Sequence, residues 1–522
     1  MNMRFTVLLL CAIVLRAEDK ADLAVVNKIR AEAFQNSKIM ETLFYLTDVN
    51  GPRVTNSTGF NSAADWAVGE LKSYGLVNVN KEPWGKFGRS WNYSHYEGHM
   101  TEPAYSPLIG YPLAWTAGTD GVVKGDAIYA PMSTMADLEK YKGKLRGKIV
   151  LTAPPKDLQL SMTPQAHRLT DEELQQRMVF VPGSGRGGFI PVAPPVANPA
   201  EVRRFRDALA AFLIAEKPAV TLIPTTQNSD GGTVFGTSGG SYKFGDPVPP
   251  PGVVLTPEHY ARIVRLLEHG IPVKLEFDIR AKFGDREEES FNIVGEIPGG
   301  SKKDEVVMIG GHFDSWHGAT GATDNGTGSA VAIEAMRILK SLNVTMDRTV
   351  RIALWSGEEE GLLGSIAYVK NHFADRADMK TKPEYSQLVA YFNSDSGTGK
   401  FRGIGVGGND ALMPIFTAWL KPFADLGATV VAGASAPPNG APAGTDHTSF
   451  AYAGLDGIGF MQEPMEYGTR THHSNMDFYD RVQKGDVMQN AAIMASFAYH
   501  TAMRAEALPR MPKPKAQAWA AR

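Results

Sequence analysis

The chain of 522 residues has one cysteine and no long run of lysine and arginine, and each absence excludes a class of protein. Cys11 has no second cysteine to pair with, so no disulfide can form within the chain. The formal net charge is -3, and without a basic cluster the chain lacks the electrostatic surface that nucleic acid requires. Hydrophobic residues make up 43% and charged residues 21%, a balance typical of globular proteins. We therefore expect a large globular protein that does not bind nucleic acid.

The first 17 residues have the pattern of a signal peptide. A charged start that ends at Arg4 is followed by an apolar stretch, residues 5–15, which is too short to span a bilayer. Ala17 supplies a small residue at which a signal peptidase could cut. We predict a leader at residues 1–17, a mature chain without a transmembrane span or cysteine, and a secreted or periplasmic location. The alternative is a buried first strand or helix.

After the leader, the chain changes its composition. Residues 23–84 have a mainly helical pattern with a turn at residues 50–53. Residues 103–282 are rich in proline and glycine and contain short strand-like runs at 148–151 and 219–223. We interpret this second part as an inserted β-rich module.

One segment of the insertion, residues 157–199, has little regular pattern. A capping-box sequence from Thr170 to Glu173 predicts the start of one helix, and the rest of the segment is predicted to be loop. We interpret this segment as a lid or a surface decoration.

From Phe291 onward, strand and helix patterns alternate regularly. Residues 306–309, 349–355 and 388–392 are short apolar runs typical of buried parallel strands. Between them, the apolar side chains of one predicted helix recur at helical spacing. They are Val331, Ala335, Ile338 and Leu342. This pattern predicts an α/β domain with a mainly parallel sheet flanked by helices, whose ligands bind beyond the carboxyl ends of the strands.

The first of these strands is followed by His312 and Asp314, and Asp324 precedes the next helix. A histidine at this position can bind a metal through one ring nitrogen while a nearby carboxylate holds the other. Asp324 could bridge two cations with its two oxygens, or it could merely cap the helix. Each motif alone is a weak signal.

Further acidic and histidine side chains follow the later strands. Glu358 and Glu359 come after the second strand, where one carboxylate could bind metal and its neighbour could move protons. The alternative for this pair is a favourable negative charge at a helix N-terminus. Asp395 follows the third strand, and two later loops contain histidines. The residues of interest in those loops are Asp446, His447, His472, His473 and Asp477. Because all these groups fall at successive loops of one sheet, we predict that they form one metal-binding site.

Together these loops resemble the co-catalytic zinc exopeptidases, a family that includes secreted bacterial aminopeptidases and glutamate carboxypeptidases. The sequences around His312, Glu358 and the pair His472 and His473 resemble the carboxypeptidase Q branch most, whose members split dipeptides. The resemblance implies a hydrolase that acts on a dipeptide or another short peptide.

The resemblance also implies a role for each residue. The resemblance implies two Zn²⁺ ions, one bound by His312 and Asp395 and the other by Glu359 and His473. Asp324 is expected to bridge the two ions, and the peptide bond between Asp324 and Asn325 is expected to be cis. Glu358 is the expected general base and acid. The residues expected to orient these groups or to contact substrate are Asp314, Asn325, Asp446, His447, His472 and Asp477, and His317 is a further substrate-contact hypothesis.

The insertion resembles a protease-associated domain. The predicted organisation is a catalytic domain at residues 18–102 and 283–508, the inserted domain at 103–282 and a tail at 509–522. Two other functions remain open: a glutaminyl cyclase-like acyl transferase with a single zinc, and a catalytically inactive binding protein. The sequence is compatible with a homodimer. It is also compatible with recognition of either the free amino end or the free carboxyl end of the peptide.

Overall fold

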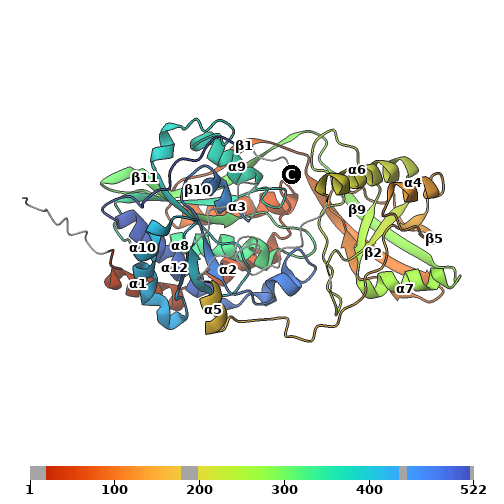
Figure 1. Cartoon of the computed structure of the whole chain (residues 1–522), viewed down its shortest axis with the longest axis horizontal. Helices are drawn as coiled ribbons and strands as arrows, with labels where there is room; N and C mark the ends of the chain where they lie inside the picture. Colours follow the sequence, from red (N-terminus) through yellow and green to blue (C-terminus); the bar gives the residue numbers. More distant parts are fainter. Residues whose placement is uncertain (1–18, 178–197, 228, 434–443, 518–522) are drawn as a thin grey trace, which may run out of the picture.

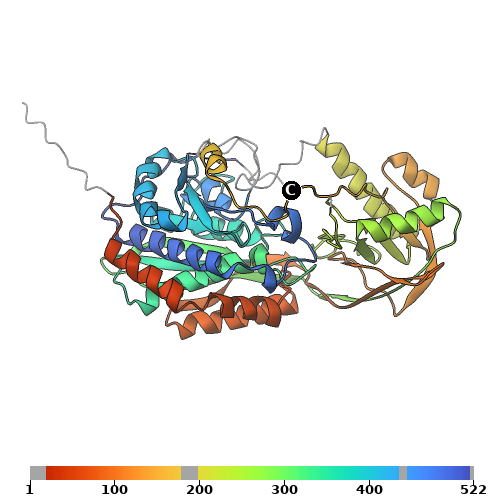
Figure 2. The same cartoon turned by 90° about the horizontal axis from the view of Figure 1, so that it is seen from below.

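The computed structural model of the protein describes residues 19–177, 198–227, 229–433 and 444–517. These residues form two modules that lie side by side along the longest axis of the molecule (Figures 1 and 2). The predicted leader, with Cys11, lies outside the described residues. In the part of the chain that the structure covers, no helix is long and apolar enough to cross a membrane.

The larger module is built on an eight-stranded mixed sheet, which confirms the predicted α/β class. Its strands, in spatial order, are β1 (Val77–Gly88), β10 (Glu288–Ile297), β12 (Arg348–Trp355), β11 (Lys302–His312), β13 (Leu388–Asn393), β16 (Gly457–Gln462), β14 (Phe401–Gly405) and β15 (Val430–Ala432). The four strands β12, β11, β13 and β16 run parallel to one another. Their carboxyl ends therefore meet at one edge of the sheet.

Helices cover both faces of this sheet. One face packs against α8 (Thr327–Ser341) and α12 (Lys484–Met503), which are almost entirely buried. The predicted apolar side chains of α8 lie in this core because they recur on one side of the helix. The other helices of the module are α1 (Leu23–Gln35), α2 (Ile39–Phe44), α3 (Thr58–Ser73), α9 (Leu363–His372), α10 (Met413–Leu420) and α11 (His447–Tyr452).

The smaller module has its own eight-stranded sheet. In spatial order its strands are β3 (Ser106–Pro107), β2 (Trp91–Glu102), β9 (Lys274–Phe283), β5 (Val123–Tyr129), β6 (Ile149–Leu151), β7 (Val220–Pro224), β8 (Gly252–Leu255) and β4 (Gly110–Pro112). Helix α7 (Pro257–Glu268) covers one face, and α4 (Met135–Tyr141) and α6 (Pro199–Glu216) cover the other (Figure 1). Neighbouring residues of β6 face opposite helices, as alternation along a strand requires.

The sheets correct two predictions. Residues 77–84 were predicted to be helical, but they belong to β1, which pairs antiparallel with β10. The inserted module was predicted to begin at residue 103, but β2 already pairs with β9 in the second sheet. Both errors concern pairing with strands about 200 residues later in the chain, which a local pattern does not contain.

The segment before α5 (Asp171–Arg177) crosses from the smaller module to the larger one (Figure 1). The capping box is formed as predicted, since the backbone N–H of Glu173 donates to Thr170 Oγ1. Leu169 and Leu174 pack against Val430 and Met461 of the first sheet. This segment is therefore a packed strap between the modules. The part of the predicted lid at residues 178–197 lies outside the described residues.

An aromatic cluster fills the junction between the modules. Phe87 and Trp316 come from the larger module, and Trp91, Trp115 and Tyr242 come from the smaller one. The rings of Trp115 and Trp316 meet edge to face, with centroids 6.0 Å apart. Large buried aromatic contacts of this kind favour one fixed relation of the two modules.

Candidate metal centre

The carboxyl edge of the first sheet gathers the predicted metal ligands. His312 is the last residue of β11, Glu359 follows β12, and Asp395 follows β13. Asp324 lies in a turn before α8, and His473 lies in the loop after β16. The topology thus explains why residues 161 positions apart in the sequence lie in one place.

The distances place Asp324 at the centre of the group. His312 Nε2 is 3.3 Å from Asp324 Oδ1 and 3.3 Å from Asp395 Oδ1. His473 Nε2 is 3.2 Å from the other oxygen, Asp324 Oδ2, and 3.0 Å from Glu359 Oε2. The structure therefore brings all five side chains together in two groups that share one carboxylate.

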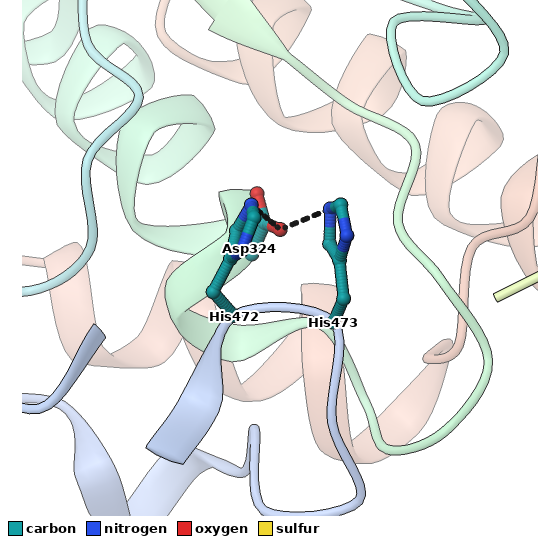
Figure 3. A group of neighbouring side chains, drawn as sticks. All are labelled: Asp324, His472 and His473. Carbon is teal, nitrogen blue, oxygen red and sulfur yellow. Dashed lines mark ion pairs between the residues drawn. The ribbon is translucent and has the colours of Figure 1, made fainter. Parts of the chain in front are cut away.

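His472 also reaches this carboxylate (Figure 3). Its Nε2 atom is 3.7 Å from Asp324 Oδ2, and its ring stacks on that of His473 with centroids 3.7 Å apart. His473 Nε2 lies 3.2 Å from Asp324 Oδ2 and 3.0 Å from Glu359 Oε2, and both distances are shorter than the 3.7 Å between His472 Nε2 and Asp324 Oδ2. The geometry therefore favours His473 over His472 as a ligand.

The polar atoms at the centre are buried and unusually poor in hydrogen bonds. Although His312 Nε2 and His473 Nε2 lie 3.0 to 3.3 Å from carboxylate oxygens, within the described residues neither nitrogen has a partner with the geometry of a hydrogen bond, and the same is true of Glu359 Oε1 and both carboxylate oxygens of Asp324. Leaving such atoms unsatisfied is costly, so native proteins normally pair them or use them to bind an ion. The nitrogen and oxygen donors face one another, as a cation site requires.

The charges of the group perturb its protonation equilibria. Burial lowers the pKa of His473, but Glu359 and Asp324 outweigh it and raise that pKa to about 10. Burial also lowers the pKa of His312, and Asp395 and Glu358 raise it well above its ordinary value. In the absence of a cation, both imidazoles would thus hold protons that a metal ion must displace.

Asp314 orients the groups on either side of it. Its carboxylate accepts hydrogen bonds from the backbone N–H groups of Glu358 (3.3 Å) and Glu359 (3.2 Å). The other ring nitrogen of His312, Nδ1, lies 3.0 Å from the backbone carbonyl oxygen of Asp314 and 3.8 Å from its carboxylate. Burial raises the pKa of Asp314 to about 6. The backbone carbonyl, rather than the carboxylate, is the closer partner of the histidine.

Asp477 and Asn325 support the central carboxylate. Asp477 accepts hydrogen bonds from the backbone N–H groups of Thr323 (2.6 Å) and Asp324 (3.0 Å), and burial raises its pKa to about 7. Asn325 Nδ2 donates to the carbonyl oxygen of Ser394 (2.8 Å), which links this turn to the loop of Asp395. The peptide bond between Asp324 and Asn325 is cis, as the resemblance implied.

The remaining predicted residues lie around this core. Asp446 is fully buried, and burial raises its pKa to about 7 while His312 opposes the shift. His447 is the first residue of α11 and packs against Gly459 of β16. The charges of His312 and Asp395 act on the pKa of Asp446, so this carboxyl group lies within electrostatic range of the central side chains.

His317 lies buried at the junction of the two modules and makes structural contacts there. It is buried, and its Nε2 atom donates a hydrogen bond to the carbonyl oxygen of Pro112 in the smaller module (2.6 Å). The rings of Trp91, Tyr93 and Tyr111 surround it at centroid distances of 5.0 to 5.6 Å. Burial lowers its pKa to about 4, so the ring is neutral and joins the two modules.

Arg53 is a supporting residue that the sequence did not reveal, because residues 50–53 indicated only a turn. Its fully buried guanidinium donates to the carbonyl oxygens of Phe313 (2.7 Å), Leu46 (2.9 Å), Thr320 (3.0 Å) and Gly321 (2.9 Å). Burial lowers its pKa to about 10, which still leaves the group charged at neutral pH. Arg53 therefore holds together the loop between His312 and Asp324 and places a positive charge beside an acidic cluster.

Comparison with known proteins shows similarity to metallopeptidases. Residues 292–498, which contain the whole cluster, match the model of peptidase family M28. Carboxypeptidase Q from Mus musculus is 25% identical over 494 residues, which cover 93% of this chain and 90% of the relative. Leucine aminopeptidase 1 from Emericella nidulans is 30% identical over 229 residues, which cover 41% of this chain and 56% of the relative.

Two solved structures share the fold across nearly the whole chain. A peptidase M28 precursor from Shewanella amazonensis SB2B has a TM-score of 0.64 and 24% identity, and the alignment covers 94% of this chain and 99% of that one. A zinc aminopeptidase from Bacillus subtilis has a TM-score of 0.54 and 18% identity, with 91% and 97% covered. The buried cluster of histidines and carboxylates lies within the residues that match the model of peptidase family M28, and together with the similarity to carboxypeptidase Q it identifies the protein as a metallopeptidase that is similar to members of that family.

Proposed function

We propose that this protein is a secreted exopeptidase that uses two zinc ions to hydrolyse the peptide bond of dipeptides or other short peptides. The observation that carries the proposal is the position of Asp324, whose two oxygens face His312 on one side and His473 on the other. The similarity to carboxypeptidase Q and to a zinc aminopeptidase supports it.

The donor atoms fit zinc. Zinc accepts mixed sets of imidazole nitrogen and carboxylate oxygen, and the buried atoms without hydrogen bonds are of these two kinds. His312 and Asp395 would hold one ion, Glu359 and His473 would hold the other, and Asp324 would lie between them. When bound, the ions would lower the pKa of a water molecule to about 7 and polarise the scissile carbonyl group.

Glu358 is the group that we assign to proton transfer. It is buried, and its backbone N–H is fixed by Asp314. Its charge contributes to the raised pKa of His312, so its carboxylate lies within electrostatic range of the cluster. From this position Glu358 takes a proton from the attacking water and passes it to the leaving amine.

A panel of dipeptides and aminoacyl amides, assayed on the purified protein together with elemental analysis, tests the proposal. We expect about two zinc ions per chain, hydrolysis of at least one class of short peptide, and loss of activity on chelation. One zinc ion per chain with cyclisation of N-terminal glutamine would instead support the acyl transferase. A zinc-loaded protein without activity on any peptide would support the inactive binding protein.

A further inference from the structure

The backbone of His473 has an unusual conformation. Its φ angle is 59°, in the left-handed region that residues other than glycine seldom adopt. Such a conformation is unfavourable for a residue with a Cβ atom and persists where surrounding contacts impose it. The contacts around His473 therefore hold its backbone in this conformation and help to orient its side chain.

Several of these contacts come from the smaller module. Asn475 Oδ1 accepts a hydrogen bond from the backbone N–H of Val234 (2.7 Å), and Asn475 Nδ2 donates to the carbonyl oxygen of Gly232 (3.0 Å). The backbone N–H of Asn475 donates to the carbonyl oxygen of Val234 (3.1 Å). The backbone N–H of Gly236 donates to the carbonyl oxygen of His473 itself (3.3 Å). Residues 232–236 thus form a short antiparallel pairing with the loop of the histidine.

Tyr111 fastens residues 232–236 to the second sheet. It lies in β4 and is buried, and its hydroxyl group is 3.0 Å from the carbonyl oxygen of Gly236 and 3.2 Å from that of Val234. The same hydroxyl is 3.5 Å from the carbonyl oxygen of His473. Its ring packs edge to face on His317, which bonds to the next residue of β4, Pro112. The pairing is therefore anchored to the body of the smaller module.

The two halves of the metal centre differ in this respect. His312 and Asp395 stand at the ends of strands β11 and β13, which pair directly with each other in the first sheet. His473 stands in a loop, and its support crosses to the other module. Loss of the pairing between residues 232–236 and the loop of His473 should therefore affect the half of the centre that contains His473 more than the half that contains His312 and Asp395.

We propose that Asn475 and Tyr111 are positioning residues through which the smaller module sets the metal affinity of the half-site formed by Glu359 and His473. This inference rests on the proposed two-zinc function. Partners that orient metal ligands typically change metal affinity about 10- to 100-fold when they are removed. We expect a loss of that size for one of the two ions.

The experiment compares Asn475→Ala and Tyr111→Phe with two control variants. Tyr105→Phe removes an exposed hydroxyl group of the smaller module, which bonds to His99. Asn80→Ala removes an exposed amide of β1, which bonds to the carbonyl oxygen of Asn78. Each zinc-loaded protein is titrated with a chelator, and bound zinc and the melting temperature are measured at every step. Activity after zinc is returned gives an additional reading.

In the two test variants, we expect one equivalent of zinc to leave at about 10-fold lower chelator concentration, and the other to leave as in the unmodified protein. Returning zinc should restore activity. The inference is overturned if both equivalents leave the folded variants as they leave the unmodified protein, or if both are weakened equally. Tyr111→Phe removes a single oxygen atom, so it provides the test even if Asn475→Ala does not fold. If the unmodified protein does not bind two zinc ions, the proposed function fails instead.

Discussion

Replacing Glu358 with glutamine removes a proton acceptor and keeps the shape of the side chain. The backbone contact with Asp314 that holds this residue does not involve the side chain that changes. We therefore expect folding and metal content to remain near those of the unmodified protein. General acid–base catalysis contributes about 10²- to 10⁴-fold, so kcat should fall by that factor, equivalent to about 3 to 5 kcal/mol in the barrier.

The adjacent variant, Glu359→Gln, is the matched comparison. Glu359 Oε2 is 3.0 Å from His473 Nε2, so loss of its charge should weaken the ion expected between these residues. We expect zinc content to fall from about two ions per chain to about one, whereas Glu358→Gln should retain both. Initial rates on a dipeptide and elemental analysis of dialysed protein measure the two effects. If Glu358→Gln retained nearly full kcat, or lost metal as Glu359→Gln does, the division of roles between the two glutamates would be refuted.

Three further outcomes are expected. His317→Phe leaves the carbonyl of Pro112 without its buried hydrogen bond, so the free energy of unfolding should fall by about 1 to 3 kcal/mol in denaturant titrations. An accompanying change in kcat as large as that of Glu358→Gln would contradict the structural role. Burial raises the pKa of Asp456 from 3.8 to about 6, so the free energy of unfolding should fall by up to about 3 kcal/mol as the pH rises through this range. Asp456→Asn lacks this titration, so its melting temperature relative to that of the unmodified protein should increase from about pH 4 to about pH 7. A constant difference would show that this carboxyl group is not perturbed. Chelation should lower the melting temperature, because an ion at a concentration of about 100 times its Kd stabilises the folded state by about 2.7 kcal/mol. An unchanged melting curve would argue against tight binding of the ion.

Three strands of the first sheet, β11, β12 and β13, and the helix after β11 could be predicted from the sequence because their signals are local. Apolar runs bounded by polar loops mark β11, β12 and β13, and helical spacing marks α8. Parallel strands place their carboxyl ends at one edge, so the histidines and carboxylates after them could be assigned to one site from the sequence alone.

The sequence by itself therefore determined the fold class and the set of side chains that meet at the metal centre. The tertiary structure decided what depends on contacts between distant segments. It placed β2 in the second sheet, buried His317 between the modules, and turned Arg53 onto the carbonyl groups of the loop after His312. It also made the smaller module a support for His473. Local sequence patterns determine which residues follow a strand. Which backbone groups form hydrogen bonds with those residues depends on how the two modules pack, and a local pattern does not contain that information.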